Sequence, residues 1–283
     1  MRGRFAPSPT GTLHLGNLRT ALLAWLFARS AGSEFLVRME DLDTGRVRPG
    51  YAEQQLADLA AIGIDWDGEV VYQSQRLALY DDALAALGDL VYECYCTRAE
   101  IREAASAPHG PLPEGAYPGT CLRLTAAELA EKRANGRAPA LRIRADAARV
   151  AFDDRLHGHV EGVVDDFVVR RNDGAPAYNL AVVVDDDAQG IEEVVRGDDL
   201  LDTTPRQIFL AGALGLPEPV YAHVPLVLGT DGARLAKRHG DVTLREVPPD
   251  RARAWMYRTL GLSDGGTLTP DLLRTGSTVF DGV

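Results

Sequence analysis

The segment at residues 4–17, RFAPSPTGTLHLGN, constrains the fold more than any other part of the chain. It begins as an extended run, passes through a turn rich in proline and glycine, and leads into apolar residues at helical spacing, Leu18, Leu22, Trp25 and Leu26. We expect this helix to begin near Gly16 or Asn17. A strand, a tight turn and a helix N-terminus form an anion site, because the first amides lack partners and the helix dipole adds positive charge. The segment therefore predicts a phosphate cradle, with His14 as a further donor.

The same segment resembles the signature of a known enzyme family. Residues 14–17, HLGN, are similar to the HIGH motif of class I aminoacyl-tRNA synthetases, and residues 4–22 resemble the glutamyl branch of that class. The resemblance extends over nearly the whole chain and is greatest to the shorter paralogues of glutamyl-tRNA synthetase. It implies an ATP site that includes His14, Gly16 and Asn17.

Alternating elements predict an α/β fold. Strands at residues 3–7 and 35–39, with a helix between them, form a right-handed unit whose strands run parallel. Further along we expect helices at 51–62, 73–90, 204–214 and 251–260, and strands at 140–144, 150–152, 166–170, 180–184 and 220–227. The turn at residues 172–174 predicts a hairpin to another strand. The resemblance implies a Rossmann-type class I synthetase catalytic domain.

The expected organisation has four parts. Residues 1–92 and 177–240 form the two halves of the nucleotide-binding domain, and the mostly β insertion at 93–176 separates them. Residues 241–283 form a short helical tail. This tail is too short for the anticodon-binding domain of ordinary glutamyl-tRNA synthetases, so we expect no such domain.

The composition of the chain limits the kinds of binding partner and the cellular location that we expect. A net charge of −11 argues against sequence-blind attraction to nucleic acid. No apolar run approaches the roughly 20 residues that a membrane span needs. The N-terminus also lacks the apolar core of a secretory signal. We expect a cytoplasmic monomer.

A second basic motif follows near the end of the α/β alternation. Residues 234–238, RLAKR, would alone be typical of a solvated loop. The resemblance aligns them with the KMSKS loop of class I synthetases, which implies that Arg234 binds ATP and that Lys237 is the catalytic lysine. A cation that closes over the triphosphate stabilises the transition state for adenylate formation. Ala236 and Arg238 replace the two serines of the motif, so a hydroxyl donor is missing.

Five residues match the glutamate-contacting positions of the family: Arg4, Ser8, Glu40, Tyr178 and Arg196. Two arginines present forked donors that suit a carboxylate. Tyr178 can donate to the same group, while Glu40 can hold the substrate ammonium. Without the resemblance, these residues would be more consistent with ion pairs of Arg196 to Asp198 or Asp199, and of Glu40 to a nearby arginine.

The three cysteines lie in the predicted insertion. Cys94 and Cys96 point to one face of a strand, and the loop rich in proline and glycine can fold Cys121 back to them. Three thiolates and a fourth ligand would form a structural zinc site. The resemblance implies Tyr117 as that ligand, with His109 as a competitor, and three free thiols are the alternative.

The acidic run at residues 185–187 is more typical of a strand end that meets solvent than of a metal site. Magnesium is expected to arrive with ATP, held mainly by the phosphates.

The resemblance implies an ATP-dependent ligase that converts L-glutamate to glutamyl-adenylate. It further implies transfer of glutamate to the queuosine base in the anticodon loop of tRNA(Asp). Two alternatives stay open at this point: a truncated glutamyl-tRNA synthetase that charges tRNA(Glu), and a non-catalytic sensor of amino acid or adenylate.

Overall fold

The computed structural model describes residues 1–105, 116–235, 239, 242–263, 266 and 278–280. It begins with β1 (Gly3–Phe5), α1 (Leu15–Ser30) and β2 (Phe35–Met39), and β1 pairs with β2 in parallel as predicted. The short β3 (Val71–Tyr72) extends this sheet beyond β2. Leu18 and Leu22 of α1 are buried against the strands, so the periodic apolar face seen in the sequence forms the centre of the larger core.

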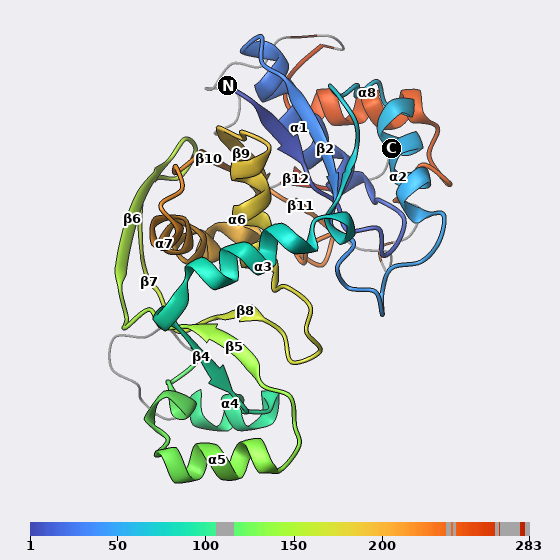
Figure 1. Cartoon of the computed structure of the whole chain (residues 1–283). Coiled ribbons are helices and arrows are strands. Elements are labelled where there is room, and N and C mark those ends of the chain that lie inside the picture. The colour runs from blue at the N-terminus through green and yellow to red at the C-terminus, as the bar shows by residue number, and fades with distance from the viewer. Residues whose placement is uncertain (106–115, 236–238, 240–241, 264–265, 267–277, 281–283) are drawn as a thin grey trace.

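A second sheet continues beside β1. Its strands β9 (Glu193–Gly197) and β10 (Val220–Val224) are parallel, and α7 (Thr204–Leu214) connects them. The amides of Glu192 and Glu193 donate to the carbonyl of Arg2, which brings β9 next to β1. The hairpin of β6 (Arg149–Asp154) and β7 (Gly158–Val163) adds to the far side, where β6 runs parallel to β10. Figure 1 shows β6 and β7 at the left edge of the molecule.

Helices cover both parts of this sheet. The helices α2 (Tyr51–Ala61) and α8 (Pro249–Thr259) lie near α1, and α8 contributes the buried Trp255 and Met256 to its core. The helix α3 (Leu77–Ala86) contributes Tyr80 to a second core. It lies between 3-10 turns at Gln73–Gln75 and Gly88–Leu90, so the predicted continuous helix at 73–90 is broken. The strands β11 (Val227–Leu228) and β12 (Thr278–Val279) form a small parallel pair.

Part of the predicted insertion at residues 93–176 forms the lower part of the molecule in Figure 1, whereas its β6–β7 hairpin joins β10 in the second sheet. Its strands β4 (Val91–Cys94), β5 (Ala140–Ile143) and β8 (Val168–Arg170) make an antiparallel sheet. Beside it lie α4 (Arg98–Ala105), a 3-10 turn at Thr120–Arg123 and α5 (Ala126–Ala134). The insertion thus contains helices as well as the predicted strands. Beyond the turn at residues 172–174 a single bridge, Arg170 to Pro176, replaces the predicted hairpin strand.

A second predicted strand is also wrong. Residues 180–184 belong to the helix α6 (Tyr178–Ala188), whose Leu180 and Ala181 pack in the second core. The run LAVVV is buried on all sides, and a short, continuous apolar run has no periodicity that separates a helix from a strand. The acidic residues that follow therefore continue a helix instead of ending a strand. No helix within the described residues combines the length and the apolar character needed to cross a membrane.

Candidate active site

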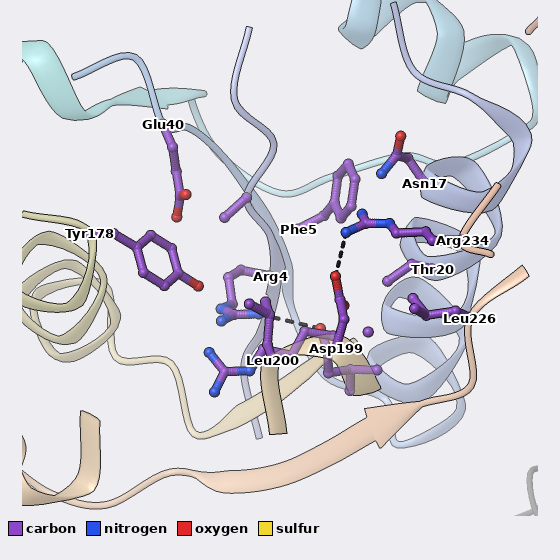
Figure 2. A pocket seen from close by; sticks show the side chains of 14 residues that line it. Arg4, Phe5, Asn17, Thr20, Glu40, Tyr178, Asp199, Leu200, Leu226 and Arg234 are labelled. Atoms are coloured by element: carbon purple, nitrogen blue, oxygen red, sulfur yellow. Dashed lines mark hydrogen bonds and ion pairs between the residues drawn. The ribbon is translucent and has the colours of Figure 1, made fainter. Parts of the chain in front are cut away.

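A cavity of about 190 Å³ lies at the carboxyl ends of β1, β2 and β9. This edge is where parallel α/β sheets generally bind ligands. Glu40 and Tyr178 face the cavity from one side, and Asn17 and Arg234 from the other (Figure 2). Arg4 lies between them. The structure therefore brings together residues from both halves of the chain that the sequence analysis assigned to glutamate and to ATP.

The N-terminus of α1 is built by a capping box. His14 is the N-cap, its Nδ1 accepts from the amide of Asn17 at 3.2 Å, and the Asn17 side chain accepts from the amide of His14. A neutral imidazole that accepts at Nδ1 carries its proton on Nε2, so that edge of the ring is a donor. The amide of Leu15 donates to the carbonyl of Val242 at 2.7 Å. Two of the first three helix amides are therefore engaged, and the expectation that all of them lack partners is wrong.

Gly16 lies in the first turn of this helix. A Cβ at this position would lie 3.0 Å from Nδ1 of His14 and 3.5 Å from Val227. The absence of a side chain lets the capping imidazole fold over the helix end. Neither Gly16 nor His14 is among the residues that line the cavity, whereas Asn17 is.

Arg4 is held by a buried carboxylate. Its Nε and Nη2 lie 3.2 and 3.3 Å from the two oxygens of Asp186, and Nη1 donates to the carbonyl of Val195 at 3.4 Å. Nη1 of Arg38 donates to the same carboxylate at 2.7 Å. Burial acts to raise the pKa of Asp186, but the charges of Arg4 and Arg38 hold it below its usual value. Asp186 therefore stays ionised and fixes the plane of the Arg4 guanidinium.

A second buried carboxylate supports the first. Asp185 accepts hydrogen bonds from Gln73 at 2.8 Å, Arg76 at 2.6 Å and Tyr80 at 2.8 Å. Its Oδ2 also lies 3.7 Å from Nε of Arg38. The acidic run that suggested a solvent-facing strand end thus supplies two buried counter-charges. The role of these two carboxylates and that of Arg38 were not predicted from the sequence.

Arg196 has neutral partners. Its Nε donates to Nε2 of His223 at 3.0 Å, Nη1 to Gln207 at 2.7 Å and Nη2 to Thr204 at 2.7 Å. The ion pairs to Asp198 or Asp199 that the sequence left open are not what holds it. Its side chain is 6% exposed and lines the cavity. Because a guanidinium has five N–H donors, two remain for a further acceptor.

Glu40 follows β2 and lines the same cavity. Burial raises its pKa to about 7, although the charges of Arg38 and Arg4 act in the opposite direction. Its Oε1 lies 3.6 Å from Nη2 of Arg38, which is the arginine contact that the sequence left open. Tyr178, the first residue of α6, is 42% exposed. Ser8 is exposed and is not among the residues that line the cavity.

The far end of the cavity belongs to the KMSKS-like segment. Arg234 lines the cavity and pairs with Asp199. Leu235 on one side of the loop donates its amide to the carbonyl of Val227, and Thr243 on the other side forms a bridge with His14. Lys237 itself lies outside the described residues. The residues that flank the loop on both sides therefore lie close to the N-terminus of α1.

A separate cluster contains the three cysteines. Cys94, Cys96 and Cys121 have sulfur atoms within 4.8 Å of one another. The hydroxyl of Tyr117 lies 3.5 Å from Cys94 and 3.6 Å from Cys96, and Cys96 lies 3.4 Å from Cys121. Ligands of a tetrahedral zinc ion with bonds of about 2.3 Å lie roughly 3.8 Å apart. The donor set therefore fits such an ion. The competing ligand His109 lies outside the described residues.

Comparisons with known proteins identify the family of the chain. The family model for the catalytic domain of class I tRNA synthetases specific for E and Q matches residues 1–258. The chain is 62% identical over 267 residues to the glutamyl-Q tRNA(Asp) synthetase of Nocardia farcinica, which covers 92% of this chain and 85% of that protein. It is 55% identical over 259 residues to the protein of the same name from Symbiobacterium thermophilum, covering 87% and 80%. The resemblance inferred from sequence is therefore confirmed.

Solved structures show the same fold. A glutamate tRNA ligase from Elizabethkingia meningosepticum in complex with its amino acid superposes with a TM-score of 0.79 at 26% identity, over 99% of this chain and 67% of that one. The glutamate-tRNA synthetase of Elizabethkingia anophelis gives 0.80 at 27%, over 99% and 68%. The predicted α/β synthetase fold and a ligase that acts on tRNA are thereby confirmed. The chain belongs to the glutamyl and glutaminyl family of class I tRNA synthetases.

Proposed function

We propose that this ligase activates L-glutamate with ATP and transfers it to the queuosine base in the anticodon loop of tRNA(Asp). The observation that carries the first half is the single cavity in which two arginines and a carboxylate lie opposite Asn17 and Arg234. The names of the relatives support the second half, since those proteins are glutamyl-Q tRNA(Asp) synthetases. The cytoplasm, where tRNA acts, is the proposed compartment.

In this proposal, the side-chain carboxylate of glutamate lies between the free donors of Arg4 and Arg196, with Tyr178 as a further donor. Ionised Glu40 holds the substrate ammonium. The α-carboxylate then points toward Asn17 and Arg234, where the triphosphate and its Mg²⁺ bind. Its oxygen attacks the α-phosphorus, the bond to pyrophosphate breaks, and glutamyl-adenylate forms. Orientation and fixed charge supply the catalysis, since no protein nucleophile is required.

The second step consumes the adenylate. A hydroxyl of the acceptor attacks the activated carbonyl carbon, an ester bond forms, and AMP leaves. Lys237 and His14 are the proposed catalytic groups near the phosphates. Gly16 contributes because its lack of a side chain leaves room for the His14 ring at the N-terminus of α1. Ser8 is given no contact in this proposal, because it is not among the residues that line the cavity.

We also propose that Cys94, Cys96, Cys121 and Tyr117 hold one structural zinc ion. The three sulfurs and the phenolic oxygen already approach one another at near-tetrahedral spacing. When bound, the ion would tie β4 to the turn that carries Cys121, within the insertion at residues 93–176.

The test is ATP–pyrophosphate exchange with glutamate in the absence of tRNA, followed by transfer of labelled glutamate. The proposal predicts exchange without tRNA, and label on queuosine-containing tRNA(Asp) but not on queuosine-free tRNA(Asp). Label on tRNA(Glu) instead would identify a 3′-end synthetase. The absence of exchange with intact, folded protein would favour the sensor alternative.

A further inference from the structure

The guanidinium of Arg196 is held by hydrogen bonds to three neutral side chains. Arg196 is on β9, and its Nε donates to the ring of His223 on β10 at 3.0 Å, while its two terminal nitrogens donate to Gln207 and Thr204 of α7. None of these three partners is a carboxylate, so each must accept through a neutral atom. The orientation of the Arg196 guanidinium therefore depends on which ring nitrogen of His223 carries a proton.

Only one tautomer of His223 fits this contact. An arginine can donate but cannot accept, so Nε2 of His223 must present its lone pair to Nε of Arg196. The proton of the neutral ring is then on Nδ1, which lies 2.7 Å from Oδ2 of Asp154. If the ring were doubly protonated, two N–H groups and two positive charges would face each other at 3.0 Å.

Asp154 is well placed to select this tautomer. It lies at the end of β6 and is 3% exposed. Its Oδ2 also accepts from the amide of His223 at 3.0 Å, while Oδ1 accepts from the amides of Leu156 and His157 at 2.9 and 3.0 Å. Because both oxygens of Asp154 already accept hydrogen bonds from amides, the carboxylate acts as an acceptor toward the ring as well. Nδ1 of His223 must therefore carry a proton and donate a hydrogen bond to Asp154.

We propose that Asp154 and His223 are positioning residues that orient Arg196 for the carboxylate of glutamate. The relay runs from a hairpin of the insertion, through a neutral imidazole, to the arginine that faces the cavity. It rests on the proposed role of Arg196 in glutamate binding. Loss of the imidazole acceptor would let the fork rotate and would weaken glutamate use without touching the ATP end of the cavity.

The charges around His223 keep its ring neutral. Burial lowers its pKa, and the positive charge of Arg196 acts in the same direction, while the carboxylate of Asp154 acts against both. Nε2 of His157 donates to the carbonyl of His223 at 3.1 Å. Burial raises the pKa of Asp198, although the two histidines act in the opposite direction. Tyr221 stacks on the ring at 5.9 Å and Thr204 lies 3.0 Å from Nε2.

The tautomer can be measured directly on the wild-type protein. Two-bond ¹H–¹⁵N spectra of ¹⁵N-histidine-labelled protein at pH 7.5 should show His223 protonated on Nδ1 alone, assigned by the signal that disappears in H223Q. A ring protonated on Nε2, or on both nitrogens, would overturn the relay. Because this readout needs no substrate, it stands even if the chain does not use glutamate.

Kinetics test the positioning role. H223L should raise the KM for glutamate in ATP–pyrophosphate exchange by about 10-fold or more, the scale for losing a hydrogen bond to a charged group. The KM for ATP should change by less than about 2-fold. H223Q should recover part of the loss, because its amide oxygen can occupy the place of Nε2. The control H159Q alters an exposed histidine, 62% accessible, and should match the wild type.

Three results would overturn the proposal: equal rises in KM for both substrates, no rise in H223L, or no advantage of H223Q over H223L. If H223L does not fold, the comparison of H223Q with the wild type and the tautomer spectrum decide the question. If the wild type shows the expected tautomer but no glutamate-dependent exchange, the proposed function fails while the hydrogen-bonded relay is retained.

Discussion

The two arginines assigned to the substrate carboxylate, Arg4 and Arg196, differ in the charge of their partners, and this difference has consequences for substrate choice. Arg4 is already neutralised by Asp186, whereas the contacts of Arg196 within the described residues are all to neutral acceptors. A substrate carboxylate would supply the counter-charge that Arg196 lacks. Glutamine would leave this buried cation unpaired, which is costly.

We therefore expect R196A to raise the KM for glutamate by about 100-fold in ATP–pyrophosphate exchange, since breaking a buried charge pair costs several kcal/mol. The KM for ATP should change little. The matched variant R196K keeps the charge but loses the fork, so its effect should be intermediate. Equal losses for glutamate and ATP would show that Arg196 supports the fold instead of the substrate.

Glu40 gives the site a pH dependence. Burial raises its pKa to about 7, and only the ionised carboxylate can hold the substrate ammonium. In the free enzyme, kcat/KM for glutamate should therefore rise as the pH increases through about 7 and level off above it. A titration of exchange rates from pH 6 to pH 8.5 checks this. The step should be absent from the E40Q variant, and a wild-type profile that is flat over this range would contradict the assignment.

The buried partners of the cavity residues could not be predicted in the same way as the residues that line the cavity. Arg4, Glu40, Tyr178 and Arg196 follow from the resemblance to the glutamyl branch. The partners of these residues come from distant parts of the chain, and sequence spacing does not reveal which carboxylate neutralises which arginine. One signal was available: an arginine in the apolar strand at residues 35–39 needs a buried partner.

At the scale of elements, the N-terminus of α1 depends on a single missing side chain. In G16A the new methyl would approach the His14 ring at 3.0 Å, so the capping imidazole must shift by a few tenths of an ångström. Alanine is at least as good a helix former as glycine, so the free energy of unfolding should stay within about 1 kcal/mol of the wild type. The KM for ATP should rise at least about 10-fold.

Denaturant titration and exchange kinetics of G16A, with A21G in the same helix as the control, separate the two effects. A21G removes a methyl from the buried face of α1 and should lower stability while leaving the KM for ATP near normal. If G16A instead loses stability and keeps its KM for ATP, the helix end has only a structural role.

Elements bounded by clear turn residues were predicted well. The parallel unit of β1, α1 and β2 follows from a Pro- and Gly-rich turn and from apolar spacing, and α7 and α8 follow from similar signals. The helix α6 was missed, because its valines favour a strand locally while tertiary burial decides the outcome. The start of α1 was placed one or two residues late, since an N-cap histidine was not anticipated.

At the scale of the whole molecule, the cysteine cluster lies apart from the cavity. The cysteine cluster belongs to the sheet of β4, β5 and β8, whereas the cavity lies at the edge of β1, β2 and β9 (Figure 1). Metal loss should therefore affect the stability of the insertion more than the chemistry of activation.

We expect about one zinc ion per chain by elemental mass spectrometry, and its loss from C121S but not from the control T97S. C121S should melt several degrees lower than the wild type, because a structural zinc ion contributes folding free energy. Exchange without tRNA should stay within about 3-fold of normal. A metal-free wild-type protein that melts at the same temperature with and without added zinc would contradict the proposed site.

The account as a whole depends on one arrangement, in which both halves of the chain converge on a single glutamyl-adenylate. A crystal structure with a non-hydrolysable analogue of that intermediate tests it most directly. We predict the side-chain carboxylate between Arg4 and Arg196, the ammonium at Glu40, and the phosphate mimic at the end of the cavity formed by Asn17 and Arg234. An analogue bound with its carboxylate away from both arginines, or in a different cavity, would contradict the account.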